Sequence, residues 1–165
     1  MQKIVFNDLE AQYAHLKKEI DAGIASVIEG CHFISGPQVE ELEKALCAYT
    51  GRKYCVTVSS GTDALLMPLM AWGIHEGDAV FVPGFTFFAT AEVVSLTGAT
   101  PVFCDIDPHT FNMDPNSLSE QIERVLREGK LTPKAVIPVD LFGQPAEFPK
   151  IEEICREHHL LVMED

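Results

Sequence analysis

The stretch Ser59–Leu65, with the sequence SSGTDAL, has the residue types of an anion-binding turn. It lies between a short β-rich run and an apolar helical pattern, so we expect it to lead from a strand into a helix. The first amides of a helix lack intrahelical acceptors, and the helix dipole adds partial positive charge there. Gly61 would allow a close backbone approach, while Ser60 and Thr62 would add hydroxyl donors. Such a turn can hold a phosphate dianion, although Ser60 or Thr62 could instead simply cap the helix.

Two further stretches could take part in chemistry. Pro83–Thr90, with the sequence PGFTFFAT, follows an apolar run and places aromatic residues at the start of a predicted helix. A ring such as that of Phe87 could stack on a planar heterocycle, or it could belong to an ordinary apolar core. Glu164 and Asp165 follow the last apolar run of the chain. A carboxylate at that point is costly to bury alone, so it either pairs with a cationic group or stays solvated.

The elements that must position these residues alternate between strand and helix after two initial helices. Strands that read as continuous apolar runs between helices indicate an α/β fold with a mostly parallel sheet and helices on both faces. In the first helix the apolar residues have the spacing of one buried face. Helices are expected over Asp8–Glu29, Pro37–Tyr49, Thr62–Trp72, Phe87–Leu96, Leu118–Arg127 and Glu147–His158, and strands over Tyr54–Ser59, Ala79–Val82, Thr100–Ile106, Ala135–Val139 and Leu160–Met163.

Composition excludes several classes of function. The chain has 165 residues and a formal net charge of −13, which argues against nucleic acid or an anionic membrane as partner. No apolar stretch reaches the length of a membrane span, and the start MQKIVFNDLE lacks the apolar core of a secretory signal. The five cysteines form no C-x-x-C, and the histidines do not cluster. We therefore expect a cytoplasmic protein with reduced thiols and no metal site.

Several motifs in order along the chain resemble the DegT/DnrJ/EryC1/StrS family of sugar aminotransferases, which are pyridoxal-phosphate (PLP) enzymes of fold type I. The resemblance implies that residues 1–53 form an N-terminal helical segment and that residues 54–165 form an incomplete PLP-binding large domain. The motifs that carry the resemblance are FNDLEAQY at 6–13, FISGP at 33–37, SGTDAL at 60–65, GDAVFVP at 77–83, TF at 86–87, GATPVF at 98–103, PVDLFGQ at 138–144 and MED at 163–165.

The resemblance assigns a role to each of the ambiguous residues. Ser60, Gly61 and Thr62 match the turn that binds the cofactor phosphate. Phe87 matches the aromatic residue that stacks on the pyridine ring, and Asp165 matches the carboxylate that pairs with the ring nitrogen. A carboxylate in that position keeps the nitrogen protonated, so that the cationic ring can draw electrons from the substrate.

The resemblance also implies a reaction and its partners. The parent protein would be a homodimer that transfers an amino group, typically from glutamate, to a nucleotide-linked keto-sugar. The lysine that forms the Schiff base in the family lies downstream of the residue matched by Asp165, and none of the eight lysines here matches its motif. We therefore expect no catalytic residue in this chain and no activity of the 165 residues alone.

Two other readings stay open at this stage. Some members of the family resemble sugar dehydratases that carry histidine in place of the lysine, and no residue before Asp165 separates the two groups. Alternatively, the chain could be a non-catalytic module that needs a partner chain to cover its sheet.

Overall fold

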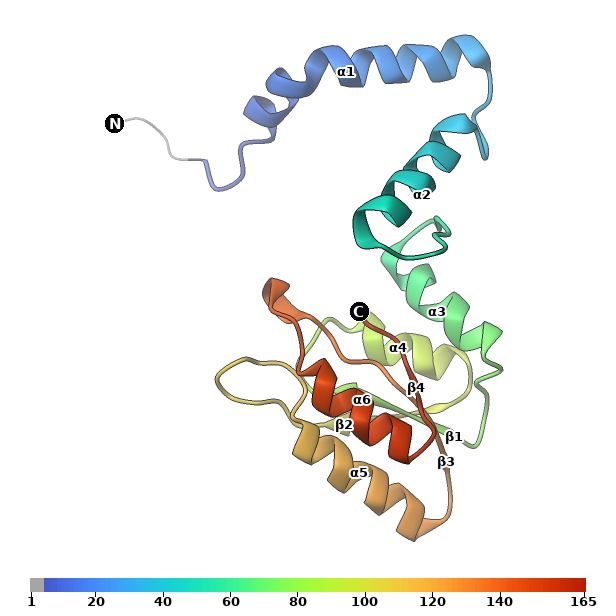
Figure 1. Ribbon diagram of the computed structural model, residues 1–165, viewed down its shortest axis with the longest axis vertical. Helices are drawn as coiled ribbons and strands as arrows, with labels where there is room; N and C mark the ends of the chain where they lie inside the picture. The colour runs from blue at the N-terminus through green and yellow to red at the C-terminus, as the bar shows by residue number, and fades with distance from the viewer. Residues whose placement is uncertain (1–4) are drawn as a thin grey trace. The chain divides into compact units, whose positions relative to one another are not determined.

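The computed structural model describes residues 5–165 (Figure 1). Residues 1–4, which belong to the start considered above for a secretory signal, lie outside the described residues. The chain divides into two compact units, Met1–Thr57 and Val58–Asp165. In the described part of the chain, no helix combines the length and the apolar character that crossing a bilayer would require.

The first unit contains the two helices that the sequence predicts, α1 (Leu9–Gly30) and α2 (Pro37–Thr50). Asp8 caps α1, since its carboxylate accepts a hydrogen bond from the amide of Ala11 at 2.9 Å. Pro37 occupies the first turn of α2, where its missing N–H costs no helical hydrogen bond. Gly51 follows the helix with a φ of +71°, a left-handed conformation that glycine adopts without strain.

The expectation of a buried face on the first helix is wrong for this structure. No residue of α1 or α2 is buried, and Leu9, Ile20 and Ile24 on the apolar stripe of α1 are exposed. A periodic apolar stripe marks the face that a helix is able to bury, but burial requires a second surface packed against that stripe. Within residues 5–57 no such surface covers it.

The strand predicted over Tyr54–Ser59 is also absent from the described structure. Val56 in its middle is 77% exposed. A strand needs a neighbour to satisfy its backbone groups, and here the Glu43 carboxylate of α2 accepts hydrogen bonds from the amide (2.9 Å) and hydroxyl (3.0 Å) of Thr57. The segment is therefore bonded to a side chain rather than to a sheet.

The second unit is the predicted α/β layer structure. Its parallel sheet has the order β2-β1-β3-β4. The strands are β1 (Asp78–Pro83), β2 (Thr100–Cys104), β3 (Thr132–Val136) and β4 (Leu161–Val162), and the helices are α3 (Gly61–Ala71), α4 (Ala89–Leu96), α5 (Pro115–Glu128) and α6 (Phe148–Glu157). A 3-10 turn, η1 (Leu141–Gly143), follows β3. Apart from the run at 54–59, every predicted strand and helix is present with somewhat different ends.

Two separate apolar clusters lie on the two faces of this sheet. All six residues of β1 are buried, and their side chains alternate between the clusters, with Phe81 in one and Val80 and Val82 in the other. The Phe81 cluster includes Leu118 and Ile122 of α5 and residues of α6. The other cluster contains residues of α3 and α4 together with Met163. The pair α5 and α6 thus covers one face and the pair α3 and α4 covers the other (Figure 1).

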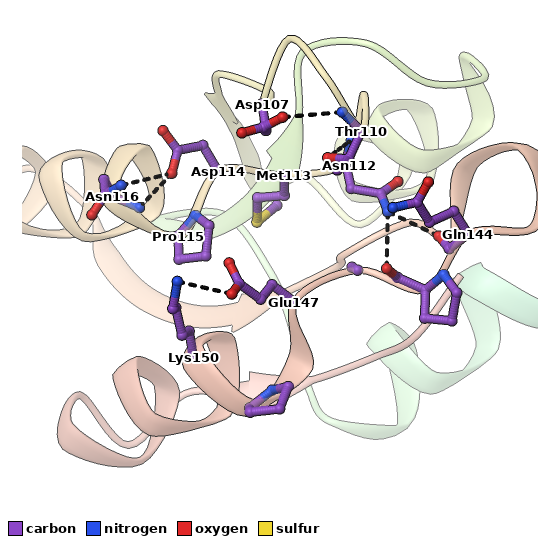
Figure 2. A pocket seen from close by; sticks show the side chains of 13 residues that line it. Asp107, Thr110, Asn112, Met113, Asp114, Pro115, Asn116, Gln144, Glu147 and Lys150 are labelled. Atoms are coloured by element: carbon purple, nitrogen blue, oxygen red, sulfur yellow. Dashed lines mark hydrogen bonds and ion pairs between the residues drawn. The ribbon is translucent and has the colours of Figure 1, made fainter.

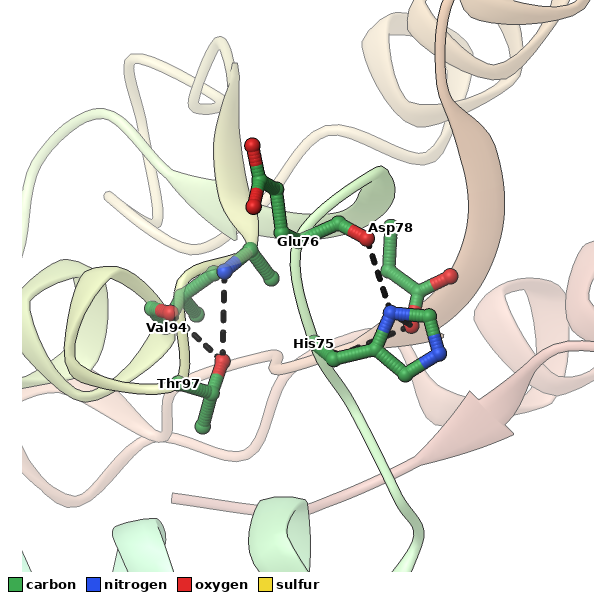
Figure 3. Close-up of polar contacts among 6 residues, drawn as sticks. His75, Glu76, Asp78, Val94 and Thr97 are labelled. Carbon is green, nitrogen blue, oxygen red and sulfur yellow. Dashed lines mark hydrogen bonds and ion pairs between the residues drawn. The ribbon is translucent and has the colours of Figure 1, made fainter.

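A buried carboxylate sits at the start of β1. Asp78 is nearly inaccessible, and its Oδ2 accepts a hydrogen bond from the amide of His75 at 3.1 Å. The ring of His75 turns back toward the carbonyl oxygen of Glu76, 2.7 Å from Nδ1 (Figure 3). A buried carboxylate requires partners of this kind, so the turn 75–78 fixes the point at which the central strand enters the sheet.

Replacing Ile122 by alanine should lower the free energy of unfolding by about 2–5 kcal/mol, because a fully buried side chain of α5 would leave a cavity against the sheet. Leu126 lies one turn further along the same helix and is 49% exposed, so Leu126→Ala should change stability by about 0.5 kcal/mol or less. Urea unfolding followed by circular dichroism measures both variants. Equal losses in the two would contradict the burial described for α5.

Candidate functional site

The predicted phosphate turn forms the start of α3. Ser60 is the N-cap, and its Oγ accepts a hydrogen bond from the amide of Asp63 at 3.1 Å. The same hydroxyl donates to Asp63 Oδ2 at 3.0 Å, and the Ser59 hydroxyl donates to that oxygen as well. The hydrogen bonds from these hydroxyls, of which that from Ser59 has the larger effect, hold the pKa of the Asp63 carboxyl below its usual range. The capping role that the sequence left open for Ser60 is therefore present.

The amides of Gly61 and Thr62 are the groups at this turn that remain for an anion. They belong to the first turn of α3, whose leading N–H groups have no acceptor inside the helix. Gly61 also has no heavy atom within 4 Å of the position that a Cβ would take, so the approach to the turn is open. A phosphate group fits this end of the helix, since the dipole and two outward amides favour negative charge.

Phe87 lies two residues before α4, in the segment that leads from β1. Its side chain is 76% exposed, so it does not belong to either apolar cluster of the second unit. Its carbonyl oxygen accepts a hydrogen bond from the amide of Thr90 at 3.3 Å, within the first turn of the helix. A flat aromatic face left open beside a helix start is available for stacking on a planar ring.

Asp165 follows β4 and is held by three hydrogen bonds. Its amide donates to the carbonyl of Pro138 at 3.0 Å, and its own carbonyl accepts from the amide of Asp140 at 2.9 Å. Its side-chain Oδ2 accepts a hydrogen bond from the hydroxyl of Thr90 at 2.8 Å. The main chain beyond β4 thus stays paired with the segment after β3, while the carboxylate is bonded to α4.

Thr90 is a residue of this site that the sequence reasoning did not single out. It is 1% exposed, and it connects Phe87 through its amide with Asp165 through its hydroxyl. A signal for it exists in the sequence, since a hydroxyl on the apolar, buried side of a helix needs a partner. The identity of that partner, 75 positions further along the chain, cannot be read from the sequence.

The topology explains why these residues share one edge of the sheet. The helix α3 ends shortly before β1 begins, and α4 ends shortly before β2 begins. The helix α4 packs along β1 and β2, and α3 packs along α4. Both helices run back toward the start of the next strand, so their own starts lie toward the carboxyl edge, which is also where Asp165 follows β4. Figure 1 marks the chain end beside α4. Open α/β sheets bind ligands at this edge.

Some of the predicted residues are connected by hydrogen bonds, and others share only an apolar cluster. Phe87 and Asp165 are linked by Thr90, as described above. The turn Ser60–Thr62 makes no hydrogen bond to either of them within the described residues, but α3, α4 and Met163 share one apolar cluster. The residues fit the parts of pyridoxal phosphate, with amides for its phosphate, an open aromatic face for its ring and a carboxylate for its ring nitrogen.

A cavity elsewhere in the second unit does not suit the phosphate of a cofactor. Figure 2 shows this cavity of about 480 Å³, which is lined by the loops after β2 and β3 and by the starts of α5 and α6. None of Ser60, Gly61, Thr62, Phe87 and Asp165 lines it. The carboxylates on its wall belong to Asp107, Asp114 and Glu147, the last of which pairs with the Lys150 ammonium at 2.8 Å. Excess negative charge disfavours an anionic group there.

The buried side chain of Asn112 connects two loops beside this cavity. Its amide nitrogen donates to the carbonyls of Gln144 (2.8 Å) and Pro145 (3.1 Å), and its Oδ1 accepts from the amide of Leu141 at 3.3 Å. Asn112 therefore fixes the loop that follows β3. This loop continues from Asp140, whose amide is bonded to Asp165, so its position is tied to that of the site.

The sequence matches the DegT/DnrJ/EryC1/StrS aminotransferase family over residues 14–165, and the chain belongs to this family. It is 47% identical over 164 residues to UDP-2-acetamido-2-deoxy-3-oxo-D-glucuronate aminotransferase of Pseudomonas aeruginosa, a match that covers 98% of this chain and 43% of that protein. The chain thus spans about two fifths of the length of the curated relatives it matches. The family predicted from the sequence is confirmed.

Two crystal structures give the corresponding comparison in three dimensions. A DegT/DnrJ/EryC1/StrS aminotransferase from Brucella abortus matches 99% of this chain and 44% of its own, with a TM-score of 0.97 and 47% identity. A Bacillus subtilis protein with bound cofactor PMP matches 89% of this chain and 32% of its own, with a TM-score of 0.79 and 34% identity. The predicted fold class is confirmed.

Replacing Ser60 by alanine should lower the free energy of unfolding by about 1 kcal/mol at pH 7, because α3 loses its N-cap. Ser60 also lowers the pKa of Asp63, so part of the loss depends on the ionised carboxylate. That part is present above the ordinary Asp pKa of 3.8 and disappears as the pH falls through the lowered value.

Urea unfolding at pH 7 and at a series of acidic pH values measures both the loss from the N-cap and the part of it that depends on ionised Asp63. Ser95→Ala is the control, since the hydroxyl of Ser95 donates to a carbonyl within its own helix at 3.4 Å and caps nothing. A Ser60→Ala loss that stays constant from pH 7 down to pH 2 would contradict the coupling between Ser60 and Asp63.

Proposed function

We propose that this chain is the N-terminal portion of a PLP-dependent aminotransferase that transfers an amino group to a nucleotide-linked keto-sugar. The observation that carries the proposal is the sharing of one sheet edge by the start of α3, the exposed ring of Phe87 and the carboxylate of Asp165. Membership of an aminotransferase family and 47% identity to a protein named for amino transfer to a UDP-linked oxo-sugar support it.

Each predicted residue has a distinct task toward the cofactor. The amides of Gly61 and Thr62 bind the phosphate, and the hydroxyl of Ser60 fixes the helix start that presents them. Phe87 covers one face of the ring, and Asp165 accepts the hydrogen bond of the protonated ring nitrogen. When bound, pyridoxal phosphate supplies an electron sink for the bonds at the substrate carbon. The PMP held by the Bacillus subtilis relative is the amino form of this cofactor.

The substrates, the oligomeric state and the location that we propose belong to the whole protein. Its amino donor is an amino acid, typically glutamate, and its acceptor is a keto-sugar carried on a nucleotide. Two subunits associate as a homodimer, no nucleic acid takes part, and the cytoplasmic location expected from the sequence stays a prediction. Because the family's lysine lies downstream of the residue matched by Asp165, we propose that these 165 residues do not transaminate by themselves.

The reaction is tested by incubating the protein at its natural length with pyridoxal phosphate, glutamate and a UDP-linked 3-keto-sugar. We expect 2-oxoglutarate and an amino sugar to appear in equal amounts, detected by mass spectrometry. The 165-residue chain under the same conditions should give neither product. Loss of a sugar hydroxyl without amino transfer would overturn the proposal in favour of a dehydratase, and robust turnover by the 165 residues would refute the inactivity proposed for them.

Replacing Asp165 by asparagine should weaken PMP binding about 10- to 100-fold. The amide keeps the shape of the side chain but removes the charge that holds the protonated ring nitrogen, and a hydrogen bond to a charged group is worth about 1.5–3 kcal/mol. Fluorescence titration of the natural-length protein with PMP measures the change. Glu153→Gln, an equal loss of charge at an exposed position on α6, should leave PMP binding unchanged. Equal affinity of wild type and Asp165→Asn would exclude Asp165 as the partner of the ring nitrogen.

A further inference from the structure

The hydroxyl of Thr90 is used differently from the hydroxyls at the other end of α4, those of Ser95 in the helix and Thr97 at its C-cap. Thr97 Oγ1 donates to the carbonyl of Val94 at 2.7 Å (Figure 3), and Ser95 Oγ donates to the carbonyl of Ala91 at 3.4 Å. Such bonds to a carbonyl three or four residues earlier are the ordinary choice for a hydroxyl in a helix. Thr90 instead donates to the side chain of Asp165 at 2.8 Å.

Both partners of this hydrogen bond have fixed backbones. Thr90 lies in the first turn of α4, and its amide is bonded to the carbonyl of Phe87. Asp165 is bonded through its amide and carbonyl to Pro138 and Asp140. The side-chain torsions of the aspartate are therefore the remaining freedom, and a hydroxyl on a buried, β-branched side chain restricts them well because threonine has few rotamers.

We propose that Thr90 is a positioning residue of the cofactor site, which holds the Asp165 carboxylate in the orientation that receives the ring nitrogen. This inference rests on the function proposed above. Oδ2 already accepts the Thr90 hydroxyl, whereas Oδ1 accepts no hydrogen bond within residues 5–165, so Oδ1 has both lone pairs available for the N–H of the ring. The same residue fixes the carbonyl of Phe87 through its amide, so one threonine sets the main chain beneath the stacking ring and the carboxylate at the ring nitrogen.

A purely structural role for Thr90 makes different predictions. A buried hydroxyl that only needs a hydrogen-bond partner would affect the stability of the fold and leave the cofactor untouched. A positioning role affects the affinity for PMP and the state of its ring nitrogen, and these effects depend on the presence of the Asp165 carboxylate. Binding and spectroscopy therefore separate the two roles, whereas activity alone would not.

The test uses the natural-length protein with the variants Thr90→Val and Thr90→Ser, and with Thr97→Val, at the C-cap of the same helix, as the matched control. Titration with PMP gives the affinity, and the ¹⁵N chemical shift of bound PMP labelled at the ring nitrogen reports its protonation. We expect Thr90→Val to weaken PMP about tenfold, the effect of losing one hydrogen bond to a charged group. Its ring nitrogen should shift toward the unprotonated value, while Thr90→Ser, which keeps the hydroxyl, stays within about threefold of wild type.

Thr97→Val should leave both readouts unchanged, because the Thr97 hydroxyl bonds only to backbone near its own helix end. In an Asp165→Asn background, Thr90→Val should cause no further loss of affinity, since the group that it positions is gone. Thr90→Ala replaces the valine variant if valine prevents folding, and the same losses are expected of it.

Three results would overturn the inference. A Thr90→Val protein that unfolds more easily but binds PMP with the wild-type affinity and ring-nitrogen shift would show a structural role alone. A tenfold loss that persists in the Asp165→Asn background would show that Thr90 acts without the carboxylate. A wild-type protein that binds neither PMP nor pyridoxal phosphate would refute the proposed function as well, which distinguishes that failure from the first two.

Discussion

The parallel pairing of β1, β3 and β4 is the constraint on which the candidate site depends. Parallel strands end at the same edge of the sheet, so the segments that follow them must emerge together. The pairing continues beyond the strands, because the amide of Asp165 bonds to the carbonyl of Pro138 and the amide of Asp140 bonds back to Asp165. The position of the carboxylate is thus set by the register of the sheet, and the helix that covers the sheet needs to supply only one hydroxyl to orient it.

Net charge and local binding capacity are separate properties in this protein. The chain carries a formal charge of −13, which is unfavourable for long-range attraction of a phosphate group. A helix start can still bind one, since the amides and the dipole act at short range, where they outweigh a diffuse and screened field. The cavity of Figure 2 is the opposite case, since carboxylates line its wall. The arrangement of the charges, rather than their sum, separates the two places.

Much of the fold could be predicted because its signals are local. The turn at Ser59–Leu65, the continuous apolar run of β1 and the glycine after α2, Gly51, depend on residues within a few positions of one another. The failures have one physical origin. The apolar stripe of α1 is able to pack against another surface, and the β-rich run at Tyr54–Ser59 is able to pair with another strand. Whether either does so depends on a partner that the local sequence does not specify.

The sequence by itself determined the order of strands and helices apart from the run at Tyr54–Ser59, the family, and the residue types suited to a phosphate, a flat ring and a cationic nitrogen. Only the tertiary structure decided that the ring of Phe87 lies outside the core and that Thr90 bonds to Asp165. The reason is that a hydrogen bond between residues 75 positions apart exists only after the sheet has placed α4 beside the end of β4. The local sequence determines which interactions a side chain is able to make, and the packing of the elements determines which partner lies within reach.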